Sequence, residues 1–223
     1  MDNLRIIQTE DGSSSLMHTG LNETYHSIHG AIQESRHVFI EAGLNKLLLN
    51  SRINNISVLE VGFGTGLNAL LTLLMTKSQG VQVTYTAIET FPLSLEILSL
   101  LNYSSVLEAT IEFQSIHQGD WNVLAQITEN FFLEKQNRKI QDAVFEKRSF
   151  DLIYFDAFAP SKQPEMWELP ILKKIVEAMK PNGIFVTYSA KGQLKRDLVS
   201  LGLSVEKIPG PTGKREMIRA IKS

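Results

Sequence analysis

The chain of 223 residues contains no cysteine. This absence excludes disulfide bonds, catalysis by a thiolate and zinc sites built from thiolates. No apolar run approaches the roughly 20 residues that a helix needs to span a bilayer, and the polar N-terminus has no apolar core of a secretory signal. We therefore expect a cytoplasmic protein without a membrane partner. The five histidines show no ligand spacing, so we expect no metal site.

The net charge of −2 is unevenly distributed along the chain. Residues 173–223 contain eleven basic and four acidic residues, which gives this segment a charge of +7 and leaves −9 for the rest. A basic end on an acidic body is typical of a protein with a polyanionic partner. Charges scattered over a solvated surface explain the same numbers equally well, so charge alone leaves both interpretations open.

Short apolar runs rich in β-branched residues alternate with longer amphipathic segments. Strands are predicted at 57–61, 81–88, 111–116, 150–155, 184–188, 203–208 and 216–221, and helices at 67–76, 93–101, 170–179 and 191–201. Residues 129–148 are interpreted as a helix and loop. This alternation predicts an α/β fold with a mostly parallel sheet covered by helices on both faces.

Two parts of the chain depart from this alternation. No helix separates the last two predicted strands, so they are predicted to form a hairpin that adds an antiparallel strand to the sheet. Residues 1–56 precede the first strand and are predicted to form a small, partly helical N-terminal lobe. The main domain is then expected to span residues 57–223.

The first predicted strand leads into a glycine-rich loop, Glu60-Val61-Gly62-Phe63-Gly64-Thr65-Gly66-Leu67-Asn68. Glycines permit a sharp turn and a close approach of backbone to a ligand. The helix that follows offers unpaired N–H groups and a positive dipole end. This arrangement predicts a nucleotide-type cofactor site in preference to a turn without a ligand. Its candidate contacts are Gly62, Phe63, Gly64, Thr65, Gly66 and Asn68.

The loop also indicates which cofactor it holds. A dinucleotide fingerprint requires its third glycine where this chain has Leu67. The pattern E-x-G-x-G-x-G is instead similar to the first motif of class I S-adenosyl-L-methionine-dependent methyltransferases. Glu89 ends the second predicted strand, where a carboxylate can accept hydrogen bonds from both ribose hydroxyls. The resemblance implies that Asp120 contacts adenine while Trp121 stacks on it; Asp120 is equally well interpreted as the N-cap of a helix.

The predicted strand 150–155 ends at Asp156, and ligands of open α/β sheets bind beyond the carboxyl ends of the strands. Asp156 is therefore the candidate catalytic residue, whereas Asp151 lies at the far end of the same strand. Two prolines stiffen the loop that follows. Phe158 and Trp167 offer stacking surface to a planar substrate, although burial against the next helix is an equally good interpretation of Trp167.

Four stretches of the chain resemble a known family. They are residues 25–44, the loop 60–68, the segment 155–167 (FDAFAPSKQPEMW) and the tail 209–217 (PGPTGKREM). They resemble the bacterial methyltransferases that complete the 5-methylaminomethyl group on the wobble uridine of tRNA, which occur alone or fused to an FAD-dependent oxidase. Ala157, Gln163 and Glu165 depart conservatively from the usual form of the third stretch.

This resemblance implies an enzyme that transfers a methyl group from S-adenosyl-L-methionine to the amine of 5-aminomethyluridine, or its 2-thio form, in the anticodon loop of tRNA. Upstream modification enzymes would supply the aminomethyl precursor. The chain ends soon after the tail, so we expect the stand-alone form without a fused FAD oxidase domain. The resemblance further implies that the N-terminal lobe walls the cofactor pocket through Tyr25, His26, Ser27, Gly30, Glu34, Ser35 and Phe39.

The basic tail fits such a substrate, because phosphate contacts set the affinity and register of an RNA while bases are read on unstacked loop nucleotides. The candidate RNA contacts are Lys162, Lys191, Lys195, Arg196, Lys214 and Arg215. Methylation of another RNA or small-molecule amine is an alternative. An NAD(P)-dependent oxidoreductase is disfavoured by Leu67, a spermidine-type aminopropyltransferase by the basic tail, and a non-catalytic RNA-binding module by the combined glycine loop, Glu89 and Asp156.

Overall fold

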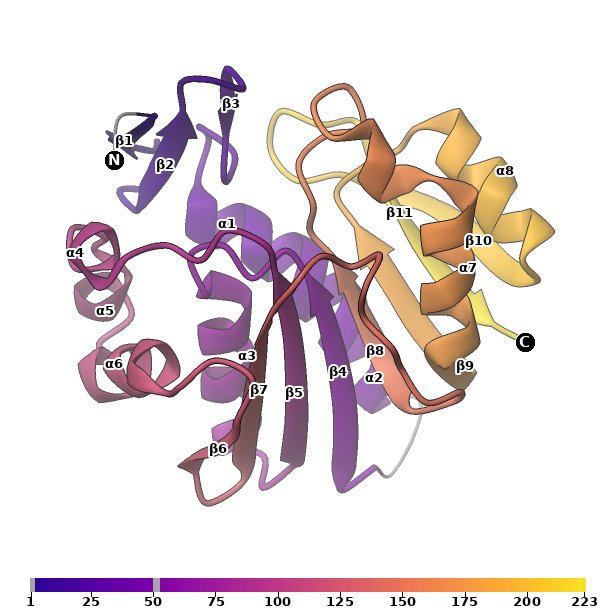
Figure 1. The fold of residues 1–223 in the computed structure, drawn as a ribbon, viewed down its shortest axis with the longest axis horizontal. Helices are drawn as coiled ribbons and strands as arrows, with labels where there is room; N and C mark the ends of the chain where they lie inside the picture. The colour runs from indigo at the N-terminus through magenta and orange to yellow at the C-terminus, as the bar shows by residue number, and fades with distance from the viewer. Residues whose placement is uncertain (1–2, 50–52) are drawn as a thin grey trace.

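The computed structural model describes residues 3–49 and 53–223; Met1, Asp2 and residues 50–52 of the predicted N-terminal lobe lie outside them. In these ranges eight strands form one sheet, in the order β10-β11-β9-β8-β4-β5-β7-β6 (Figure 1). The strands are β4 (Asn55–Val61), β5 (Gln82–Glu89), β6 (Leu124–Thr128), β7 (Phe131–Asn137), β8 (Phe150–Phe155), β9 (Met179–Thr187), β10 (Leu203–Pro209) and β11 (Glu216–Lys222).

Strand pairing confirms the predicted α/β fold. The neighbouring strands from β7 through β5, β4 and β8 to β9 all pair in parallel. β10 and β11 form the predicted antiparallel hairpin, and β11 pairs antiparallel with β9. The carboxyl ends of β4, β5 and β8 therefore meet at one edge of the sheet, where ligands of such folds bind.

Helices cover both faces of the sheet, because the side chains of each central strand alternate between two buried faces. On β4, Val58 belongs to one hydrophobic core and Leu59 to the other, and on β8 Tyr154 and Phe155 divide in the same way. The helices after β4 are α3 (Leu67–Lys77), α4 (Leu95–Leu98), α5 (Tyr103–Val106), α6 (Thr110–Gln118), the 3₁₀ turn η2 (Pro164–Trp167), α7 (Leu169–Ala178) and α8 (Gly192–Ser200).

The predicted strand 111–116 is wrong, because these residues belong to helix α6. Phe113 and Ile116 are buried one helical turn apart, whereas Ile111 is exposed to solvent. The third parallel strand is β7, in the segment that was interpreted as a helix and loop. β7 has the period-2 burial of a strand, but one of its buried positions is Lys135, whose charge hides the pattern.

Two of the helices predicted from the sequence also differ from those in the structure. The helix predicted over 93–101 is limited to α4, and α5 follows as a separate short helix. A helix beginning after Asp120 is not formed, because residues 124–128 are strand β6, which pairs antiparallel with β7.

The N-terminal segment combines a small antiparallel sheet with helices. Its elements are β1 (Leu4–Gln8), β2 (Ser14–His18), β3 (Glu23–Thr24), α1 (Ala31–Ser35), the π-helical segment η1 (Arg36–Asn45) and α2 (Lys46–Leu49). η1 packs directly on the large sheet: the Phe39 and Tyr154 rings are 5.1 Å apart, and a Cβ on Gly43 would lie 3.0 Å from Val186. The segment therefore shares a core with the sheet.

Figure 1 shows the small β1–β3 sheet at the same end of the molecule as the β10–β11 loop. Both lie at the end of the large sheet where β4 terminates. Two parts of the chain that are distant in sequence therefore border the same edge. Within the described ranges, no helix is both long and apolar enough to cross a membrane.

Candidate active site

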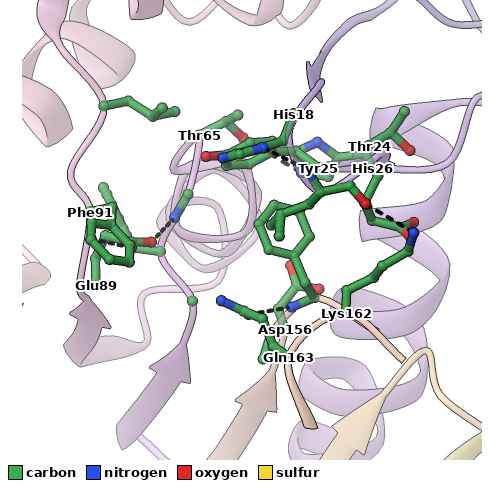
Figure 2. Close-up of a pocket in the computed structure, with 18 of the residues that line it drawn as sticks. His18, Thr24, Tyr25, His26, Thr65, Glu89, Phe91, Asp156, Lys162 and Gln163 are labelled. Carbon is green, nitrogen blue, oxygen red and sulfur yellow. Dashed lines mark hydrogen bonds between the residues drawn. The ribbon is translucent and has the colours of Figure 1, made fainter. Parts of the chain in front are cut away.

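A cavity of about 900 Å³ opens at the carboxyl ends of β4, β5 and β8 (Figure 2). Its walls include residues 62–65 of the glycine loop, residues 88–94 after β5, Asp156 with the loop that follows it, and residues 23–28 of the N-terminal segment. The volume is typical of a small-molecule site. The structure therefore brings together the four regions that the sequence analysis assigned to one site.

The glycine loop lies against the end of β8. Gly62 has a φ of 93°, and a Cβ at this position would lie 2.5 Å from the Asp156 carbonyl oxygen. The loop is anchored from β5, because the N–H groups of Gly62 and Phe63 both donate to the Ile88 carbonyl at 3.0 and 3.3 Å. Any residue larger than glycine at 62 would push the loop away from Asp156.

Glu89 is fixed at the opposite side of the cavity from Asp156, together with Phe91 (Figure 2). Its carboxylate accepts the Gly64 N–H at 3.0 Å and the Phe91 N–H at 2.8 Å. These bonds hold the carboxylate at the cavity wall beside bare glycine backbone. The arrangement fits an adenosine-containing cofactor, with Glu89 as the acceptor for ribose hydroxyls.

Asp156 lies at the other side and is bonded to the start of α3. Asn68 Nδ2 donates to Asp156 Oδ2 and to Glu60 Oε1, both at 2.8 Å. Burial and repulsion by Glu34 raise the pKa of Asp156 to about 7, although the Asn68 hydrogen bond and the positive charge of Lys214 act against this increase. Burial and the neighbouring Asp156 also raise the pKa of Glu60 well above its usual range.

Glu34 and Lys214 form an ion pair inside the cavity. Lys214 Nζ donates to Glu34 Oε1 at 2.6 Å and lies 3.9 Å from the centre of the Tyr188 ring. The other oxygen, Oε2, accepts the Ser27 N–H at 2.7 Å. Tyr188 in turn donates its hydroxyl to the Ala157 carbonyl at 2.8 Å. Lys214 was predicted as an RNA contact, but its ammonium group points into the site.

Aromatic rings from the N-terminal segment close the cavity above Asp156 (Figure 2). The Tyr25 and Phe158 rings meet edge to face with their centres 5.0 Å apart, and His18 is 6.4 Å from Phe158. His26 is buried, which lowers its pKa to about 4, and its Nε2 lies 3.5 Å from Thr65 Oγ1. These contacts seat the N-terminal segment on the glycine loop.

Two predicted substrate contacts have a structural role instead. Lys162 borders the cavity, but its ammonium donates to the carbonyls of Leu21 and Asn22 at 2.9 and 3.2 Å. It therefore ties the loop after β8 to the β2–β3 turn and is not directed at a phosphate. Trp167 is buried, and its indole N–H donates to the Phe158 carbonyl at 2.9 Å. Trp167 supports the loop from below, which corrects its assignment as stacking surface.

Three predicted cofactor contacts, Gly66, Asp120 and Trp121, lie away from the cavity, and so do Gly30, Ser35 and Phe39 of the predicted N-terminal wall. Asp120 and Trp121 follow helix α6, so the premise that they come after the third strand is wrong. Trp121 packs edge to face against Phe63, and the Lys135 ammonium lies 5.2 Å from the centre of its ring. Gly66 caps α3, and a Cβ on it would lie 2.8 Å from His117 Cε1. Gly66 is therefore required for packing between α3 and α6.

The remaining basic candidates lie outside the cavity, on the parts of the chain that border it. Lys191 and Arg196 are exposed near the start of α8, and Arg215 is exposed next to Lys214. The pKa of Glu216 is lowered, first by a hydrogen bond from Lys207 and also by the charges of Arg215 and Lys195. α8 and the β10–β11 loop therefore place several positive charges close together.

Several cavity residues were not predicted from the sequence, notably His18, Glu23, Phe91, Ile140 and Tyr188. Phe91 follows Glu89 by two positions, which is a signal that could have found it. Ile140 follows the unrecognised strand β7, so it was out of reach. Across the residues that the structure describes, no group of three or more acidic or histidine side chains could hold a metal ion.

Comparisons with known proteins agree with this geometry. The sequence model of a family described as "S-adenosyl-L-methionine-dependent methyltransferase" matches residues 112–223. Over 88% of its length the chain is 32% identical to the "tRNA 5-methylaminomethyl-2-thiouridine biosynthesis bifunctional protein MnmC" of Leptospira borgpetersenii serovar Hardjo-bovis. Over 92% it is 29% identical to the protein of the same name from Campylobacter hominis. The chain spans about a third of the length of these relatives, 32% and 31% respectively.

A solved structure is similar over nearly the whole chain. The crystal structure of MNMC2 from Aquifex aeolicus superposes with a TM-score of 0.77 at 28% sequence identity. The match covers 97% of this chain and 69% of that one. The sheet order and the N-terminal segment described above thus have a counterpart in an experimental structure.

Proposed function

This chain belongs to the family of S-adenosyl-L-methionine-dependent methyltransferases, and from that premise we propose that it methylates the amine of 5-aminomethyluridine in tRNA, or of its 2-thio form, at the wobble position. The observation that carries the proposal is the position of Asp156, which shares one cavity with the glycine loop. Similarity over 88% of the chain to a bifunctional protein of tRNA 5-methylaminomethyl-2-thiouridine biosynthesis supports the tRNA substrate class.

The cofactor would lie along the glycine loop. When bound, S-adenosyl-L-methionine supplies a methyl group on a positively charged sulfur. Gly62 and Gly64 offer backbone without a side chain, and Glu89 offers acceptors for the ribose hydroxyls. Ser27 and Glu34 wall the same cavity from the N-terminal segment. These residues would therefore hold the cofactor in the cavity that Asp156 also lines.

Asp156 has two tasks toward the acceptor amine. A protonated alkylamine has no lone pair, and its reference pKa of about 10.4 is far above that of an ordinary aspartate. The raised pKa of Asp156, about 7, narrows this gap and makes Asp156 a better proton acceptor. Because Asn68 holds Oδ2, the carboxylate keeps a fixed orientation toward the amine. Asp156 thereby orients the lone pair and takes up the proton.

The remaining rate enhancement would come from positioning the two reactants and excluding water from the cavity. Tyr25 and Phe158 cover the cavity above Asp156, and Lys162 ties their two segments together. Holding two reactants in a productive geometry can contribute up to roughly 7–11 kcal/mol. The wobble base lies in a single-stranded loop, so it can be turned out of the stack into such a pocket.

The tRNA backbone would meet the basic rim formed by Lys191, Lys195, Arg196 and Arg215. Among the residues that the structure describes, Lys191, Lys195 and Arg215 form no ion pair within 4.0 Å. Lys191 follows the cavity residue Tyr188 by three positions, and Arg215 follows Lys214 directly. These charges therefore lie on segments that adjoin the cavity in sequence, where they would contact phosphates of an inserted loop.

Nucleoside mass spectrometry tests the reaction. tRNA that carries 5-aminomethyluridine is incubated with the protein and S-adenosyl-L-methionine, and its nucleosides are then analysed. We expect conversion to the singly methylated amine, and loss of most conversion in Asp156→Asn with cofactor binding retained. Absence of conversion by wild-type protein that binds the cofactor would direct the search to another amine acceptor.

Charge reversal tests the RNA surface. Lys191→Glu combined with Arg215→Glu should weaken tRNA binding and reduce the slope of log affinity against log salt by about 1 to 2. Cofactor affinity should stay unchanged. Lys173→Glu is the matched control, because Lys173 belongs to the same basic segment but lies on α7 beside Glu177. Equal tRNA affinity of both variants would show that the rim is ordinary surface charge.

A further inference from the structure

Glu60 is a carboxyl group for which the proposed reaction has no use. It lies on β4 next to the last residue of the strand, is completely buried and does not line the cavity. Its Oε1 accepts one N–H of Asn68 at 2.8 Å. Within residues 3–49 and 53–223, its Oε2 forms no well-aligned hydrogen bond, but the carboxyl group interacts with the neighbouring Tyr85 hydroxyl, which like Asn68 acts to lower the pKa of Glu60. A buried acid without a cation requires an explanation.

Asn68 links this acid to the cavity. Both N–H groups of its amide are used, one by Glu60 and the other by Asp156, and among the described residues its Oδ1 has no partner. Two carboxyl groups thus share one uncharged donor in a region of low dielectric. Two negative charges in that arrangement repel each other strongly, so the pair holds a proton at neutral pH.

The surroundings decide which of the two acids holds it. Asp156 borders the cavity and is within the influence of the Lys214 ammonium, as well as of Glu34. Glu60 is surrounded by the neutral side chains of Asn68, Tyr85 and Tyr154, with Asp156 and Glu89 as the nearest charges. Asp156 is the less buried of the two acids, and the Lys214 charge offsets part of the Glu34 repulsion there, whereas Glu60 is completely buried with no cation among the charges that act on it. The proton therefore resides on Glu60.

We propose that Glu60 is a positioning residue, a permanently neutral acid that holds the Asn68 amide so that the ionised group of the pair is Asp156. The Asn68 side-chain amide cannot flip by 180°, because its oxygen would then face both Glu60 and Asp156. Both acids would have to be protonated to donate to that oxygen. Each component has one role: Glu60 orients Asn68, Asn68 orients Asp156, and Asp156 contacts the amine. The assignment of Asp156 as the group that contacts the amine rests on the proposed function.

Kinetics of two Glu60 variants test this role. Glu60→Leu removes the acceptor for Asn68 and should lower kcat about tenfold while KM for the cofactor changes little. Glu60→Gln keeps an uncharged acceptor of the same shape, so it should restore most of that loss. The acidic limb of the kcat pH profile should stay within about 0.3 pH units of wild type in the Gln variant, because no charge beside Asp156 is removed.

The opposite result has a distinct form. If Glu60 is ionised, Glu60→Gln removes a negative charge beside Asp156, and the acidic limb moves to lower pH by about one unit or more. That shift, or a Gln variant as impaired as the Leu variant, would overturn the inference. Thr72→Val is the matched control. Thr72 Oγ1 donates a hydrogen bond to the backbone carbonyl of Asn68 within α3 and forms no hydrogen bond to Glu60 or Asp156. It should leave the pH profile of wild type unchanged.

Infrared spectroscopy separates this inference from the proposed function. The wild-type protein without cofactor or RNA should show the band of a protonated carboxyl group at pH 8, and this band should be missing in Glu60→Gln. Absence of the band in wild type would overturn the neutral Glu60 whether or not the protein methylates tRNA. If the band is present but no tRNA is methylated, the proposed function fails while the neutral Glu60 stands.

Discussion

Replacement of Asp156 by asparagine should make the protein more stable and inactive at the same time. The carboxyl group of Asp156 is largely removed from water and lies near Glu34, which raises its pKa from 3.8 to about 7. Asparagine has the same shape, and its Oδ1 can still accept the hydrogen bond from Asn68. The variant therefore removes the cost of ionising a buried acid without removing the packing around it.

The sign and size of the effect follow from linkage. A group whose pKa is raised by folding favours the folded state at low pH, and this contribution is lost as the pH rises through the folded pKa. With values of 3.8 unfolded and about 7 folded, the raised pKa of Asp156 lowers stability by about 2 kcal/mol at pH 5, where only the unfolded state is ionised, and by about 4 kcal/mol at pH 8. The advantage of Asp156→Asn over wild type should thus grow by about 2 to 3 kcal/mol between these pH values.

Urea unfolding followed by circular dichroism measures the difference. Wild type and Asp156→Asn are compared at pH 5 and pH 8 without cofactor, with equal m-values as the check that both unfold in the same way. Asp151→Asn is the matched control at the other end of β8. Asp151 accepts bonds from Ser57 N–H and Lys180 Nζ, so its replacement should lower stability.

The reasoning is refuted if Asp156→Asn has the same advantage at both pH values within about 0.5 kcal/mol, since the linkage relation leaves no other pattern for a raised pKa. A gain in stability together with loss of methyl transfer would instead show that the site retains a destabilising charge for the sake of its chemistry, as is common in active sites.

Three further predictions concern single contacts. Gly62→Ala should cost at least about 1–3 kcal/mol in thermal unfolding, because its Cβ would lie 2.5 Å from the Asp156 carbonyl at a φ of 93°; stability equal to wild type would contradict this. Glu89→Gln should weaken S-adenosyl-L-methionine binding in calorimetry by about ten- to a hundredfold, because an ionic acceptor is lost; unchanged affinity would remove Glu89 from the cofactor site. Lys162→Met should speed proteolysis at the β2–β3 turn, because two bonds to its carbonyls disappear, while tRNA affinity stays equal; weaker tRNA binding would restore the phosphate role.

The parts of the fold that could be predicted from sequence are those in which burial and apolarity coincide. β8 is buried on both faces and is apolar apart from Asp151, and most of the buried positions of β4 are apolar and β-branched or leucine, so both strands are visible in the sequence. β7 is equally buried, but Lys135 occupies one of its inward positions. Its ammonium donates to the His117 carbonyl, a long-range contact that no local pattern reveals. Because β7 was not predicted, residues 111–116 were interpreted as the third strand, and Asp120 and Trp121 were therefore expected to follow it as adenine contacts.

The candidate site also contains residues whose positions could be predicted from the sequence and others whose positions could not. Gly62, Glu89 and Asp156 were predicted to share a site because the carboxyl ends of neighbouring parallel strands meet at one edge, and they line one cavity. The direction of the basic side chains could not be predicted in this way. Lys162 and Lys214 were both interpreted as solvent-facing RNA contacts, yet each is bonded to a partner far along the chain. Such partners become visible only in three dimensions.

The Glu34–Lys214 pair joins residues 180 positions apart, so the pocket is assembled from parts of the polypeptide that are distant in sequence. Chains are synthesised from the N-terminus, and Glu34 therefore has no ionic partner until residue 214 has been added. A carboxylate buried without that partner is costly. A chain that terminates before residue 214 would lack strand β11. It would also leave the Glu34 carboxylate, which accepts the Ser27 N–H, without its cation. The wall of the pocket that contains Glu34 is therefore electrostatically complete only after Lys214 has been synthesised.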